Sequence, residues 1–232
     1  MGVLGFFIST IYKSLFLAGE SGYKLAHPAS KLAFIASAAA FLALRSPASF
    51  LATPLVLVLG AIHPGLSWVA SALALSALAG SYFALSAYLL SLTGLYYMSL
   101  LDVLLVALRT SSISLLILFA FTTISPLDLF NALLAAGARR FSSYPLLVWR
   151  LAPQGLKNFA ESLAVGSLKR EPATKRIPAA AASIIEAGWL TEEYCYWRLR
   201  AEPTKRIKLG TSPRHTLLLV AASAILLIAC LA

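Results

Sequence analysis

Few residues of this chain carry side chains that could do chemistry, and those few are scattered. The three histidines, His27, His63 and His215, and the two cysteines, Cys195 and Cys230, show no metal-ligand spacing. The sequence also contains no glycine-rich phosphate-binding loop that ends in Lys and Ser or Thr. We therefore expect no catalytic residue, no metal held by protein ligands and no cofactor in this chain.

The composition is typical of a membrane protein. Of the 232 residues, 59% are apolar and only 12% are charged, whereas a soluble domain carries about 25% charged residues. No Asp, Glu, Lys or Arg occurs between Arg45 and Asp102. These proportions exclude an ordinary soluble globule and predict an all-α, polytopic membrane protein.

Five apolar runs predict about five membrane-spanning helices, each of which needs about 20 residues. The runs are residues 31–45, 50–63, 66–92, 97–123 and 214–232. The first two are short, and the Ser46-Pro47-Ala48-Ser49 break between them favours a hairpin of two helices. Residues 3–18 are apolar but interrupted by Lys13, which favours a helix at the membrane interface, with a true span as the alternative.

Charged residues are concentrated in one block near the C-terminus. Fourteen of the nineteen Lys and Arg residues lie in residues 124–214. Because loops rich in Lys and Arg stay in the cytoplasm, we expect this block to be cytoplasmic. Four spans before the block put residue 30 on the same side, which is consistent with Lys24 and Lys31. The predicted parts are an N-terminal interfacial helix (1–25), a transmembrane region (26–123), a cytoplasmic region (124–213) and a last transmembrane helix (214–232).

Small residues recur at every fourth position within residues 66–92. They are Ala72, Ser76, Gly80 and Ala84. Small residues at this spacing let two helix backbones approach closely in lipid. We expect packing within this chain, with docking of a partner membrane protein as the alternative.

Asp102 and Arg109 are the ionised residues of the apolar run 97–123. A charge near the bilayer centre costs about 2.5–3.5 kcal/mol on insertion scales, so each must face protein or water. An ion relay would need more carboxylates than this. We expect an interfacial anchor or an internal pair.

The cytoplasmic block is predicted to contain one short helix and two longer amphipathic helices. Ser125-Pro126-Leu127-Asp128 is a helix start, and that helix runs to about Ala136. The second helix is expected from Pro153 to Arg170 and the third from Pro178 to Arg200. The apolar faces are predicted to include Leu156, Phe159 and Leu163 in the second helix, and Ile185, Tyr194 and Trp197 in the third.

The ends of the two amphipathic helices repeat each other. Residues 171–177 and 202–207 both contain Glu-Pro followed by Thr-Lys-Arg-Ile. We favour a shared task over coincidence, and two equivalent basic tips suggest two equivalent partners.

Four stretches resemble the transmembrane coupling subunit of energy-coupling-factor (ECF) transporters, the CbiQ/EcfT family. They are His27 to Leu32, then Leu108-Arg109 with Phe121 to Leu129, then Arg150 to Pro153 with Glu161 and Lys169-Arg170-Glu171, and last Glu192 to Ala201. The family's coupling tips usually read Ala-Arg-Gly. Here they read Lys169-Arg170-Glu171 and Leu199-Arg200-Ala201, which keeps the arginine and alters its neighbours.

The resemblance implies a chain that works inside a larger importer. Two ABC-type ATPase subunits would bind the tips at Arg170 and Arg200, with Arg176 and Arg206 as fallback contacts, and a separate membrane subunit would capture the substrate. The chain itself is then not an enzyme. The substrate would be a micronutrient, either a metal ion such as cobalt or nickel or a vitamin.

Two other classes remain as alternatives. An autonomous channel or secondary transporter needs a polar path through the bilayer, for which one Asp and one Arg in about five spans are few. A purely structural membrane protein is the second alternative. The cluster Lys205-Arg206-Ile207-Lys208 could bind anionic lipid, although a solvated charge cluster is the simpler interpretation, and we expect no nucleic-acid partner.

Overall fold

The computed structural model describes residues 3–16, 21–44, 50–94, 98–200 and 210–231, and these residues form helices and connecting turns without any strand. The predicted all-α class is confirmed. The chain divides into two compact units. The apolar unit comprises residues 13–124 and 210–232, and the polar unit comprises residues 1–12 and 125–209.

The apolar unit contains most of the predicted membrane region. Its helices are α2 (Pro28–Ala43), α3 (Ala52–Ile62), α4 (Leu66–Leu92), α5 (Leu100–Thr123) and α10 (Pro213–Leu231), preceded by the short 3-10 helix η1 (Gly22–Leu25). Helices α4, α5 and α10 are long and apolar enough to cross a membrane, so the chain fits a membrane protein. Helices α2 and α3 have 16 and 11 residues, which is short for a core of about 30 Å. The total of five spans stays a prediction.

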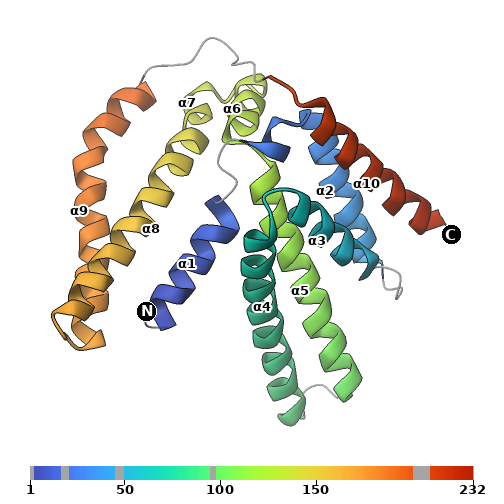
Figure 1. The fold of residues 1–232 in the computed structure, drawn as a ribbon, viewed down its shortest axis with the longest axis horizontal. Helices are drawn as coiled ribbons and strands as arrows, with labels where there is room; N and C mark the ends of the chain where they lie inside the picture. The colour runs from blue at the N-terminus through green and yellow to red at the C-terminus, as the bar shows by residue number, and fades with distance from the viewer. Residues whose placement is uncertain (1–2, 17–20, 45–49, 95–97, 201–209, 232) are drawn as a thin grey trace. The chain divides into compact units, whose positions relative to one another are not determined.

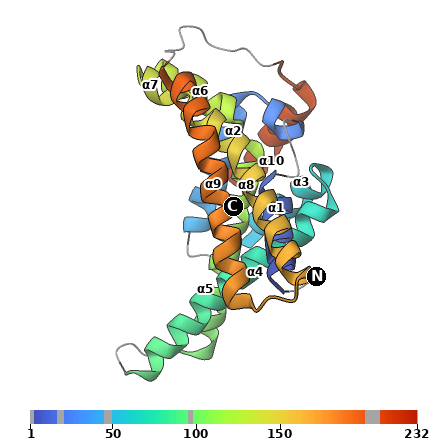
Figure 2. The same ribbon diagram turned by 90° about the vertical axis from the view of Figure 1, so that its left-hand side faces the viewer.

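Helices α4 and α5 lie side by side along their length (Figures 1 and 2). Ala72, Ser76 and Gly80 on α4 are buried. A Cβ atom added to Gly80 would lie 2.6 Å from the carbonyl oxygen of Ala107 and 2.1 Å from Oγ of Ser111, both on α5. At Gly80 the stripe therefore packs against α5 of this chain, whereas Ala84 is half-buried. Docking of a partner along the stripe stays a prediction.

The core of the apolar unit is aromatic and centres on Phe119 of α5. The ring centroids of Tyr23, Phe34 and Trp68 lie 5.6, 5.6 and 5.9 Å from the centroid of Phe119. Trp68 also donates from Nε1 to the carbonyl of Ser14, at 2.8 Å. Four segments far apart in the sequence thus meet on one side chain.

The polar unit contains α6 (Pro126–Ala135), α7 (Arg139–Ser142), α8 (Tyr144–Leu168), α9 (Ala173–Arg200) and residues 3–12 of α1 (Val3–Phe16). The predicted start of α6 is confirmed. Oγ of Ser125 accepts from the backbone N–H of Leu127, and the Asp128 carboxylate accepts from the backbone N–H of Ser125. This reciprocal capping satisfies donors that the first helical turn leaves unpaired.

The predicted starts of the two long helices were wrong. Pro153 lies inside α8, which begins nine residues earlier at Tyr144, and Pro178 lies inside α9, which begins at Ala173. An internal proline costs about 3 kcal/mol, mainly by removing one helical hydrogen bond. Packing offsets this cost, because α8 contacts α6 and α9, and Ala180 of α9 is fully buried.

Gly80 offers a direct test of the α4–α5 contact. We expect Gly80→Ala to lower the free energy of unfolding by about 1–3 kcal/mol, because the new methyl group meets the α5 backbone. Gly80→Leu should lower it further. The measurement is thermal melting of the purified chain in detergent. Gly188→Ala is the control, because a Cβ atom there meets no described residue within 4 Å. Equal melting of the two alanine variants would contradict the contact.

Candidate functional site

Helices α8 and α9 form an antiparallel hairpin, joined by residues 169–172 (Figure 1). Two glycines of α8 bring the helices together. A Cβ atom on Gly166 would lie 2.7 Å from Cγ of Arg176, and one on Gly155 would lie 4.0 Å from a methyl carbon of Ile184. Arg176, Ala180 and Ile184 are four residues apart and so share one face of α9. That face packs on α8.

The first predicted tip lies in the turn of this hairpin. The backbone N–H of Glu171 donates to the carbonyl of Gly166, and that of Arg170 donates to the carbonyl of Ser167, at 3.1 Å each. This pair of bonds is a Schellman motif, which closes the C-terminus of a helix. Arg170 has a φ of 54°, in the left-handed region where glycine is usual.

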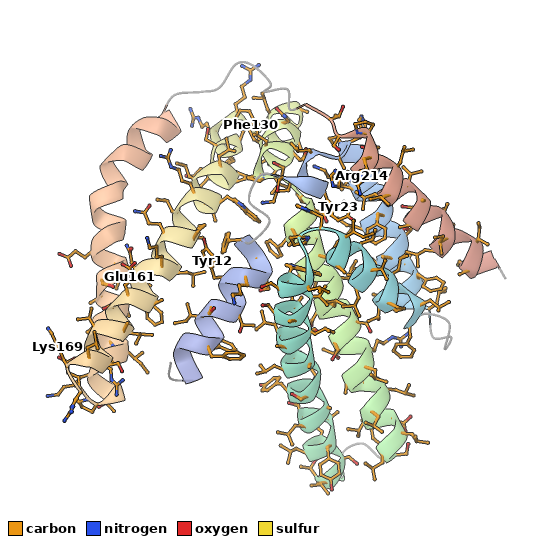
Figure 3. The ribbon with its side chains drawn as sticks, in the orientation of Figure 1. Tyr12, Tyr23, Phe130, Glu161, Lys169 and Arg214 are labelled. Atoms are coloured by element: carbon orange, nitrogen blue, oxygen red, sulfur yellow. The ribbon has the colours of Figure 1, made fainter. Side chains whose placement is uncertain are left out.

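The side chains of this tip are exposed. Lys169 and Arg170 lie on the outside of the turn, and Figure 3 labels Lys169 there. A left-handed conformation costs a non-glycine residue about 1–2 kcal/mol, which the two backbone bonds offset. The arginine therefore projects from a turn whose backbone is fixed.

The second predicted tip ends α9. Helix α9 has 28 residues, so Arg170 and Arg200 lie near opposite ends of a helix about 42 Å long. The side chains of Tyr194, Trp197, Leu199 and Arg200, together with all of Ala201 and Arg206, lie outside the described residues. The equivalence of the two tips therefore stays a prediction. In the first copy of the repeat, Lys175 and Arg176 lie in the first turn of α9, and not at the tip.

The predicted apolar faces are divided between two environments. Leu156, Phe159 and Leu163 of α8 are half-buried, as expected for a packed face. Ile185 of α9 is 58% exposed, because Ala180 and Ile184 occupy the face toward α8. A partner contact at Ile185 stays a prediction.

Asp102 and Arg109 do not pair with each other; each serves a helix end. The Asp102 carboxylate accepts from the backbone N–H and the hydroxyl of Ser99, which caps the start of α5. Arg109 donates from Nε to the carbonyl of Leu42, at 3.4 Å, and from its terminal nitrogen to the carbonyl of Leu44. These carbonyls end α2 and would otherwise lack helical partners. The anchor interpretation fits both contacts.

Two histidines that are far apart in the sequence come together in the apolar unit. The ring centroids of His63 and His215 are 5.7 Å apart. The ring centroid of Tyr23 lies 6.0 Å from that of His63 and 5.3 Å from that of His215. Burial raises the pKa of Tyr23 to about 12, against the opposing effect of the Arg214 charge; Figure 3 labels both residues. Burial, and then the nearby His215, lower the pKa of the His63 imidazole.

Sequence reasoning missed this cluster, since 152 positions separate its histidines and no spacing rule links them. Within the described ranges, no group of three or more His, Cys, Asp or Glu residues could hold a metal ion. Lys24 and Lys31, which are consistent with a cytoplasmic residue 30, are 1% and 2% exposed, and the Lys31 ammonium donates to the carbonyl of Lys24. The side of the membrane on which residue 30 lies stays a prediction.

Comparison of the chain with protein-family models, with curated proteins and with solved structures gives no match. The functional argument therefore depends on the geometry of the described residues.

Arg109 tests the importance of helix-end contacts in the apolar unit. We expect Arg109→Met to lower the free energy of unfolding by about 1–3 kcal/mol, because the Leu42 and Leu44 carbonyls lose a charged donor. The stability of Arg109→Lys should fall between those of the parent and Arg109→Met, since an ammonium replaces the planar guanidinium. Detergent melting of the three proteins is the measurement, and identical curves would remove the anchor role.

His63 predicts how stability depends on pH. Its pKa is lower in the fold than the ordinary value of 6.5, so the fold favours the neutral ring. Below about pH 6.5 the unfolded chain takes up a proton that the fold resists. Stability should therefore be complete above this pH and fall as the pH drops further. His63→Gln should reduce the slope of the melting temperature between pH 8 and 5.5 without removing it, because the neighbouring His215 also titrates. A variant with the parent's full slope would refute the assignment.

Proposed function

We propose that this chain is the transmembrane coupling component of an ECF-type ABC importer. Two ABC-type ATPase subunits bind its cytoplasmic hairpin, and a separate membrane subunit captures the micronutrient, a metal ion such as cobalt or nickel or a vitamin. The chain transmits motion and hydrolyses no ATP itself. Residues 124–213 face the cytoplasm of the cell that this membrane encloses.

The observation that carries the proposal is the α8–α9 hairpin with its arginine tip. Arg170 is exposed on a turn that two backbone hydrogen bonds hold in place. A planar guanidinium can bind a carboxylate through two parallel hydrogen bonds, and it stays charged at every physiological pH. Such a tip suits a partner surface that must stay bound while the ATPase subunits move repeatedly.

The packing of the hairpin suits transmission of that motion. The Arg176 stem lies against Gly166, and Ala180 is fully buried, so α8 and α9 are in close contact. A displacement of the tip then moves whole helices and does not merely bend a loop. Sliding of packed helices is a recognised way to carry such a change. In this proposal ATPase closure tilts the capture subunit through these helices.

The placement of Asp102 and Arg109 weakens the channel alternative. Both charges are engaged with helix ends, Asp102 at the start of α5 and Arg109 at the end of α2. A conduction path would need polar groups that are free to meet the transported ion. A structural membrane protein would leave the exposed arginine turn without a task.

Charge reversal at both tips tests the proposal. The tagged chain is purified from its native membrane, and ABC-type ATPase subunits are quantified per chain by mass spectrometry. We expect Arg170→Glu with Arg200→Glu to abolish co-purification, because each lost charge-assisted contact is worth about 1.5–3 kcal/mol. Arg170→Asn should lower the yield of ATPase about tenfold while keeping the turn, since Asn tolerates the left-handed conformation.

Arg150→Glu is the matched control. Arg150 is exposed on the same helix but lies 20 positions from the tip, so its reversal should leave the ATPase ratio unchanged. Wild-type ATPase ratios in the double variant would refute the proposal. Loss of ATPase in the Arg150 variant as well would show a general charge effect and would also refute the tip assignment.

A further inference from the structure

A groove of about 720 Å³ lies within the polar unit, between residues 5–12 of α1, the second half of α8 and the start of α9. Its walls are mostly apolar side chains, including Ile8, Leu156, Leu163 and Ile177. The volume falls in the range of about 300–1,000 Å³ that is usual for small-molecule sites. Ligand sites are concave and mostly apolar with a few polar groups, so an apolar groove of this size is a candidate binding site.

The groove also contains a cation without a counter-charge on its walls. Arg176 lines it, and the Nε of Arg176 is buried with no hydrogen-bond partner among the described residues. Lys157 is the other charged lining residue, and it lies 3.8 Å from Glu161, on the outer surface of α8. A buried charged donor without a partner is costly. An anionic group near Arg176 would remove that cost.

Gly166 explains how the arginine reaches this position. The absence of a side chain there lets the Arg176 stem lie flat on α8, since a Cβ atom would be 2.7 Å from Cγ and 3.1 Å from Cδ. The Arg176 side chain lines the groove near the hairpin turn, whose residues Lys169, Arg170 and Glu171 together carry one net positive charge. The groove thus has a cationic end and an apolar length.

We infer that this groove binds one anionic phospholipid, with an acyl chain along the apolar walls and the phosphate at Arg176. The chain's apolar spans place it in a membrane, which supplies such molecules. Because Lys157 lies beside Glu161, Arg176 is the cation of the lining without an acid nearby on the walls, which favours a net negative headgroup over a zwitterionic one. The exposed rings of Phe6 and Phe7 on α1 suit contact with the membrane interface. The inference does not rest on the importer proposal.

The test measures lipid binding to the purified, delipidated full chain by native mass spectrometry. The probes are phosphatidylglycerol and phosphatidylcholine with identical acyl chains, in competition. We expect one phosphatidylglycerol per chain, preferred about tenfold, because both lipids offer a phosphate to Arg176 but only phosphatidylcholine adds a quaternary ammonium, which the guanidinium repels. Arg176→Met keeps the packed stem and should abolish the preference. Ala160→Phe fills the groove and should abolish binding of both lipids.

Lys175→Gln is the matched control, because it removes a neighbouring exposed charge that does not line the groove. It should bind both lipids like the parent. Glycerol phosphate, which has the anionic group without acyl chains, should not compete. The inference is overturned if the parent shows no preference between the two lipids, or if Arg176→Met and Lys175→Gln show the same lipid preference. Competition from glycerol phosphate would also overturn it. So would a dimer that Ala160→Phe dissociates, because a second copy of the chain would then be the occupant.

Discussion

Backbone groups at helix ends need partners, and in a membrane water is not available to supply them. In this chain the scarce charged side chains meet that need. Asp102 caps the start of α5, Arg109 binds the last carbonyls of α2, and Lys31 binds the carbonyl of Lys24 ahead of α2. These three charged side chains of the apolar unit are therefore engaged in binding backbone groups at or near helix ends. Because each of these charges binds a backbone group at or near a helix end, the apolar helices can be stable with only a few ionised residues.

In the polar unit, one contact has a comparable role. The stem of Arg176 lies on Gly166, four residues before the turn that presents Arg170. This contact brings the start of α9 against the end of α8, and it places a guanidinium beside the apolar groove. The exposed tip, which the two backbone hydrogen bonds hold, and the groove thus lie close together at this end of the hairpin.

Local signals predicted those elements that depend on neighbouring residues. The capped start at Ser125 and the stop before Pro172 follow from side chain to backbone bonding and from the geometry of proline. The prolines at 153 and 178 misled the prediction, since packing of α8 and α9 tolerates a lost hydrogen bond that an isolated helix would not. The face of α9 that packs on α8 contains Ile184 and not the predicted Ile185, because Ala180 and Ile184 approach α8 more closely than Ile185 can.

The sequence by itself determined the helical class, the long apolar spans, the close-packing stripe around Gly80 and the basic turn at Arg170. These features depend on composition and on spacings within a few residues. Only the tertiary structure decided that His63 meets His215, that Arg109 reaches the end of α2, and that Arg176 lines a groove. Such contacts join residues from distant parts of the sequence, and no local periodicity encodes which helices meet. The physical reason is that helices pair through the fit of their complete surfaces. That fit involves side chains from several helices, and the residue pattern within one helix does not specify it.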